Sequence, residues 1–154
     1  WLAPNVLLQK FPAEEFMVTT KLTFHPAEKL LGEKTGLTVM GFSYANIAVE
    51  KNKEGTFIVY TTCKDAEKGQ GEKKTEIMKV SGQDIYLRVI VTKGAQCKFG
   101  YSLDGKNFSY QQALFTAEVG RWIGAKVGLF CTRDTQTNDS GYADYDWFRI
   151  EPIE

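Results

Sequence analysis

Apolar and polar residues alternate with a period of two along most of this chain. The β-strand is the element in which successive side chains point to opposite faces. In the run from Phe16 to Phe24, for example, Phe16, Val18, Leu22 and Phe24 fall on one face. No comparably long run repeats apolar residues at the 3.6-residue period of a helix. The pattern therefore predicts an all-β fold.

Eight such runs follow one another at short spacing, and they cover residues 16–24, 36–40, 44–51, 56–63, 84–93, 96–103, 122–132 and 142–150. The charged, glycine-bearing segment 64–74 is expected to be a loop, and Asp104-Gly105 is a hairpin-turn dipeptide. A helical turn is expected, if anywhere, within residues 113–120. Strands of this length with no dividing linker predict one antiparallel β-sandwich of jelly-roll type over residues 1–154.

Charge and cysteine content exclude several classes of function. The chain has 19 basic and 19 acidic residues, so no overall field favours nucleic acid or a membrane surface. It has no apolar run of the ~20 residues that a transmembrane helix needs, and no signal-peptide pattern at its start. The cysteines Cys63, Cys97 and Cys131 form no CxxC pair, and His25 is the single histidine. A zinc site is therefore not expected, and the thiols are expected to pack as small apolar groups.

The closing run, GYADYDWFRI, places Asp144 and Asp146 two residues apart. On a strand, such acids share one face about 6.5 Å apart. They could be an acid/base pair, a metal corner or structural groups. An inverting glycosidase needs carboxylates about 6.5–9.5 Å apart, but aspartate is a short general acid and no glutamate lies in this run. The structural interpretation is favoured.

Two kinds of binding site are candidates. Sandwiches of this type often hold one calcium ion between strand ends, and Asp134, Asp139 and Asp144 crowd the last loop. The alternative there is a solvated polar loop, and no other cofactor is expected.

Sugars stack their C–H faces on aromatic rings, and the outward faces of the predicted strands offer Tyr60, Tyr86, Arg88 and Trp122. The alternative for these four side chains is packing beneath loops.

An ordered set of segments then resembles a known family. It consists of NVLLQKF (5–11), TKLTF (20–24), GLTVMG (36–41), IYLRV (85–89), YSLDG (101–105), IGAKVGL (123–129) and ADYDWFR (143–149). Together these resemble the C-terminal concanavalin A-like β-sandwich of glycoside hydrolase family 43, the β-xylosidases and α-L-arabinofuranosidases. The segments are also similar to carbohydrate-binding module family 91.

The resemblance implies that a catalytic β-propeller precedes the sandwich and carries the acid and base of an inverting mechanism. This chain would then have no catalytic residue and no hydrolase activity alone. In β-xylosidase members, the sandwich lends an aromatic side chain to the propeller's pocket. The matching region here makes Trp1 the candidate, with Leu2 as its alternative. The residues name no compartment, and a secreted or periplasmic bacterial parent enzyme is compatible with them.

Two hypotheses follow. The chain is expected to be an accessory domain that packs on the propeller of an enzyme acting on xylo- or arabino-oligosaccharides. The alternative is a free-standing carbohydrate-binding module for xylan or arabinoxylan. The first needs an apolar docking patch, and the second needs an exposed aromatic platform.

Overall fold

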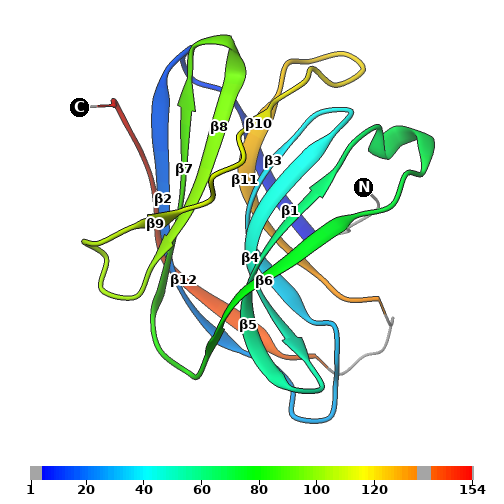
Figure 1. Cartoon of the computed structure of the whole chain (residues 1–154), viewed down its shortest axis with the longest axis vertical. Helices are drawn as coiled ribbons and strands as arrows, with labels where there is room; N and C mark the ends of the chain where they lie inside the picture. The colour runs from blue at the N-terminus through cyan, green and yellow to red at the C-terminus, as the bar shows by residue number, and fades with distance from the viewer. Residues whose placement is uncertain (1–4, 135–139, 154) are drawn as a thin grey trace.

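Two antiparallel β-sheets lie face to face in the computed structural model, which describes residues 5–134 and 140–153 (Figure 1). Sheet A has the strand order β1 (Asn5–Lys10), β11 (Lys126–Thr132), β3 (Lys34–Met40), β4 (Tyr44–Asn52), β5 (Gly55–Cys63), β6 (Lys73–Val80). Sheet B has the order β10 (Phe115–Thr116), β8 (Gln96–Ser102), β7 (Ile85–Thr92), β2 (Phe16–His25), β12 (Tyr142–Glu151), and β9 (Ser109–Tyr110) pairs with β8. The predicted all-β, concanavalin A-like sandwich is confirmed.

Three local expectations are wrong. The segment 64–74 is a loop only in part, because β6 begins at Lys73 and a short 3-10 turn, η1, spans Ala66–Lys68. Residues 113–120 hold no helix; β10 lies there instead. Strand β11 begins at Lys126 rather than at Trp122. A second 3-10 turn, η2 (Lys93–Ala95), joins β7 to β8. No helix in the described part of the chain is long and apolar enough to span a membrane.

The core lies between the sheets and follows the predicted alternation. Val18 and Leu22 of β2 are fully buried, as are Leu87, Val89 and Val91 of β7. Each such side chain contributes about 1.5–3 kcal/mol by leaving water. The alternation along β2 and β7 therefore supplies much of the core on the sheet B side.

A hydrogen bond also crosses the core from one sheet to the other. The Tyr145 hydroxyl on β12 lies 2.7 Å from Thr35 Oγ1 on β3, and the Thr35 hydroxyl also lies 3.0 Å from the Phe130 carbonyl. Burial raises the pKa of Tyr145, so the phenol stays neutral. Thr35 and Tyr145 thus fix how the final strand sits against sheet A.

Candidate functional site

The outward face of sheet B gathers aromatic and arginine side chains from three segments. Because Tyr86 pairs with Lys21 and Lys21 with Trp147, these three side chains form one row across β7, β2 and β12. Arg88, Thr19 and Arg149 form the next row in the same way. We call the set Tyr86, Arg88, Phe108, Trp147 and Arg149 the aromatic–arginine face.

Arg88 lies at the centre of this face. Its Nε donates a hydrogen bond of 2.9 Å to Thr19 Oγ1, and its guanidinium carbon lies 3.6 Å from the centre of the Phe108 ring. Stacking on the ring fixes the plane of the guanidinium.

A second arginine repeats the arrangement on β12. The Arg149 guanidinium lies 4.3 Å from the Trp147 ring centre, and Trp147 lies 6.1 Å from Tyr86 at an interplanar angle of 50°. Tyr86 and Trp147 are both partly exposed. Two arginine–aromatic pairs therefore flank Thr19.

The turn after β8 holds one rim of the face in place. The Asp104 carboxylate accepts hydrogen bonds from the backbone N–H groups of Lys106 and Asn107, each at 2.8 Å. These bonds hold the pKa of Asp104 well below its usual range. Gly105 takes φ +72°, and a Cβ there would lie 2.9 Å from the Tyr86 ring. The predicted Asp104-Gly105 turn is confirmed, and it packs tightly on Tyr86.

A β-bulge separates the two aspartates of the closing run. The pairing of β12 with β2 shifts between Tyr145 and Trp147, so Asp146 has no cross-strand partner. Asp146 contacts Lys21 at 2.5 Å, and Asp144 lies 3.4 Å from His25 Nε2. Each carboxylate has its own basic neighbour, which supports the structural interpretation.

Lys21 is shared with a third carboxylate, that of Asp84, at 2.8 Å. Hydrogen bonds to Asp146 and Asp84 raise the pKa of Lys21, and the bond from Lys21 lowers the pKa of Asp84.

The four predicted sugar-contacting residues do not converge. Tyr86 and Arg88 share the aromatic–arginine face, as their alternation predicted. Placing Tyr60 on an outward face was wrong: it is 8% exposed, and its ring lies 5.5 Å from Phe99 in the core. Burial raises the pKa of Tyr60 to about 12. Trp122 lies outside any strand.

Trp122 lies in the connection between β10 and β11 and is 88% exposed. The connection is held on the β3–β4 turn. Phe42 N–H donates to the Val119 carbonyl at 3.1 Å, and the Ser43 hydroxyl donates to Glu118 at 2.6 Å. Gly41 allows this approach, because a Cβ there would lie 1.9 Å from the Glu118 carbonyl oxygen. The Trp122 indole is therefore exposed on a turn that hydrogen bonds hold in place.

The Glu33 carboxylate links the segment around Ala27 to the residues on either side of the last loop, a role that the sequence analysis missed. This carboxylate is 6% exposed and accepts bonds of 2.7 Å from the backbone N–H groups of Ala27 and Gly141. Arg133 lies 3.4 Å away. The signal in the sequence was weak, because Glu33 follows a glycine in a stretch without alternation.

The predicted calcium ligands are only partly described. Asp134 and Asp144 lie within the described residues, whereas Asp139 lies outside them, as does Trp1. No cluster of three potential metal ligands occurs within residues 5–134 and 140–153. Calcium binding stays a prediction.

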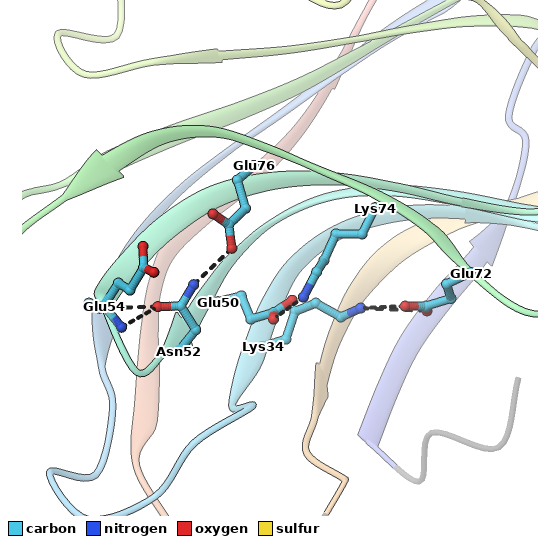
Figure 2. Close-up of polar contacts among 8 residues, drawn as sticks. Lys34, Glu50, Asn52, Glu54, Glu72, Lys74 and Glu76 are labelled. Atoms are coloured by element: carbon cyan, nitrogen blue, oxygen red, sulfur yellow. Dashed lines mark hydrogen bonds and ion pairs between the residues drawn. The ribbon is translucent and has the colours of Figure 1, made fainter.

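The outward face of sheet A carries two ion pairs (Figure 2). Lys34 lies 3.2 Å from Glu72, and Lys74 lies 2.5 Å from Glu50. The Tyr44 hydroxyl donates to Glu72 at 2.6 Å. Burial alone would raise the pKa of Glu72, but Tyr44 and Lys34 outweigh it and lower the pKa.

Beside these ion pairs, the outward face of sheet A also carries buried polar and small residues. Asn46 of β4 and Thr61 of β5 face each other across the strands, at 3% and 0% exposure. Asn46 Oδ1 and Thr61 Oγ1 have no hydrogen-bond partner among the described residues. At the edge of the sheet, a hollow of about 260 Å³ is lined by Asn52, Lys53, Glu54 and Glu76.

Comparison with known proteins gives a consistent result. The family of β-xylosidase C-terminal concanavalin A-like domains matches residues 1–151. A β-xylosidase of Formosa agariphila is 38% identical over 78 residues, which are 51% of this chain and 13% of that protein. The chain thus matches only a small part of its curated relative.

Solved structures share the fold. A bifunctional GH43-CE protein of Bacteroides eggerthii superposes with a TM-score of 0.79 at 22% identity, over 99% of this chain and 19% of that one. A xylan β-1,4-xylosidase of Bacillus halodurans gives a TM-score of 0.77 at 16% identity, over 95% and 29% of the two chains.

Proposed function

Because the chain belongs to the C-terminal concanavalin A-like domains of glycoside hydrolase family 43 β-xylosidases, we propose that it is an accessory domain of a glycosidase. It packs on a catalytic propeller of the same parent protein and helps to shape the pocket for short xylo- or arabino-oligosaccharides. Catalytic residues lie on the propeller, and this chain alone turns over no glycoside.

The exposed Trp122 carries the proposal. Leaving an indole 88% exposed on an anchored turn forgoes the stabilisation of burying it. Tryptophan is also enriched among the residues that contribute most to binding energy at interfaces. Val119, 62% exposed, lies in the same connection, and Leu114, 56% exposed, lies just before β10. An adjoining domain would cover this patch.

The edge strand β1 supports the same docking side. It pairs with β11 only, and its Leu7 and Val6 side chains are 75% and 43% exposed. Exposed apolar edge strands tend to pair with other chains unless another part of the protein covers them. β1 pairs with β11, and the Trp122 turn leads into β11, so both features adjoin the same strand of sheet A.

The expected benefit to the enzyme is enclosure of the substrate. A side chain from a neighbouring domain that closes an open propeller pocket excludes water and orients a short substrate. Trp1, the residue implied by the family resemblance, remains a candidate for this role. Trp122 is the candidate within the described part of the chain.

The test is hydrolysis of an aryl xyloside and of xylobiose by the full-length parent enzyme and by its Trp122→Ala and Trp1→Ala variants. We expect Trp122→Ala to lower kcat/KM about tenfold, which is about 1.4 kcal/mol of transition-state stabilisation. The melting temperature of the isolated chain should stay nearly constant because the indole is exposed in it.

The matched control is Tyr142→Ala, which removes another exposed aromatic ring, from β12 of the other sheet. This variant should leave kcat/KM unchanged. Unchanged kinetics in both tryptophan variants would refute the pocket role, and turnover by the 154-residue chain alone would refute the accessory assignment.

A carbohydrate-binding module is the second candidate, and the aromatic–arginine face favours it. Partly exposed rings at Tyr86 and Trp147 offer surfaces on which sugars could stack. Titration of the isolated chain with xylohexaose and insoluble xylan tests this function. Absence of binding at millimolar ligand would exclude it.

A further inference from the structure

We propose that the aromatic–arginine face binds an acidic sugar, with Arg88 and Arg149 holding the carboxylate of a uronic acid unit. The proposal rests on the assignment of the chain to a glycan-degrading protein. It specifies the charge of the ligand, which neither hypothesis above addresses.

The hydrogen bonds of Arg88 leave most of its donors free. A guanidinium has five N–H donors in a planar fork. Within the described residues, the Arg88 side chain uses one of them, on Thr19, and pairs with no carboxylate. A partly buried cation without a counter-charge favours an anionic ligand, and a guanidinium matches the two oxygens of a carboxylate.

Arg149 supplies a second, more exposed cation on the same row. Thr19 pairs with Arg88 on one side and with Arg149 on the other. Their Cα atoms are therefore separated by two strand spacings, about 10 Å. Among the described residues Arg149 likewise forms no ion pair, and its guanidinium lies against the Trp147 ring. Thr19 is short and 3% exposed, because neighbouring side chains, among them Arg88, cover it.

The nearby acids are already engaged. Asp84 and Asp146, the carboxylates close to this row, both bind Lys21. Asp144 lies against His25 at the end of β2. Lys21 offsets one of the two negative charges of Asp84 and Asp146, so with Arg88 and Arg149 included the basic side chains outnumber these two carboxylates by one.

The rings would hold the rest of the sugar. Trp147 and Tyr86 lie beside the arginine row and present apolar surface to the C–H groups of a pyranose. Phe108 fixes the Arg88 plane, and the bonds to Asp104 in the preceding turn limit motion of that rim. A site that is ordered before binding loses less entropy on complex formation.

The experiment is calorimetric titration of the chain with xylotetraose and with the same oligosaccharide bearing one glucuronic acid branch. We expect the acidic ligand to bind at least about tenfold more tightly, and its affinity to fall as salt rises. Arg149→Gln and Arg88→Gln should each weaken binding of the acidic ligand about tenfold.

Lys79→Gln is the matched control. Lys79 lies 5.8 Å from the Phe57 ring centre on sheet A, so this variant removes one cation from a ring on the other sheet. It should not alter binding of the acidic ligand. Arg149 is exposed, so its variant should fold even if Arg88→Gln does not.

Three outcomes would overturn the proposal: equal affinity for acidic and neutral ligands, no binding of the acidic ligand, or acidic-ligand affinity unchanged in Arg149→Gln. Preference for a sulfated xylo-oligosaccharide over the uronate would show that the anion is tetrahedral and the carboxylate assignment wrong. None of these outcomes bears on the Trp122 variants of the parent enzyme, so the two proposals fail independently.

Discussion

Replacing Thr61 with valine should stabilise the protein. The Thr61 hydroxyl is fully buried on β5 and has no hydrogen-bond partner among the described residues. A buried polar group without a partner costs about 1–3 kcal/mol, because it loses its bonds to water. Valine has nearly the same shape and carries a methyl group in place of the hydroxyl. It also suits a β-strand.

We expect Thr61→Val to raise the free energy of unfolding by about 1 kcal/mol, the low end of that range, since the methyl must fit the space of the smaller hydroxyl. For a domain of this size, the melting temperature should rise by about 2–4 °C. Urea unfolding followed by tryptophan fluorescence gives the free energy, and calorimetry gives the melting temperature.

The matched control is Thr35→Val. Thr35 is 1% exposed, and its hydroxyl lies 2.7 Å from the Tyr145 hydroxyl and 3.0 Å from the Phe130 carbonyl. Here the same substitution breaks bonds and leaves buried groups unpaired, so it should cost about 1–3 kcal/mol. The two variants should therefore change stability in opposite directions.

Destabilisation by Thr61→Val of 1 kcal/mol or more, on the scale of a lost hydrogen bond, would refute the reasoning. It would show that the Thr61 hydroxyl has a hydrogen-bond partner, such as an ordered water.

Three further results are expected. The pKa of Asp104 is depressed in the folded state. The stabilisation that the Asp104 carboxylate gives is therefore present above about pH 4, its pKa in the unfolded chain, and is lost as the pH falls toward its pKa in the folded protein. The melting-temperature difference between wild type and Asp104→Asn should accordingly vanish in acid. Burial raises the pKa of Cys97 to about 12, so iodoacetamide at pH 8 should label it only after unfolding and should label the less buried Cys131 first. Gly128→Ala should detach β1 and open residues 5–10 to proteolysis, because a Cβ there would lie 2.0 Å from the Leu7 carbonyl oxygen; an unchanged digestion pattern would contradict this.

Alternation of apolar and polar residues predicted the strands that have one solvent-exposed face. In β7, Tyr86 and Arg88 face outward between buried neighbours, so both the strand and the face could be assigned from the sequence. In β5 the run from Thr56 to Cys63 is apolar or β-branched throughout, and the pairing shifts between Ile58 and Val59. Both faces of that strand are largely buried, so period two could not show that Tyr60 points inward.

The charged edge of sheet A could not be assigned for the opposite reason. Lys73, Lys74 and Glu76 of β6 are exposed, as befits an edge strand, and their composition is that of a loop. Trp122 was wrongly assigned to a strand, because an apolar ring next to the residues of β11 suggested a longer strand. Long-range contacts such as those of Glu33 depend on the tertiary fold and leave no local pattern.

The pairing of first strands with last strands bears on how the protein is made. Strand β1 pairs with β11 and β2 with β12, so each sheet joins its N-terminal strand to one that is synthesised more than 110 residues later. On the ribosome, β1 has no strand partner until β11 is made, and β2, which also pairs with β7, lacks its second partner until β12 is made. Such distant pairing slows folding and prolongs exposure to aggregation. Production of the domain should therefore depend on chaperones and on slow translation at low temperature.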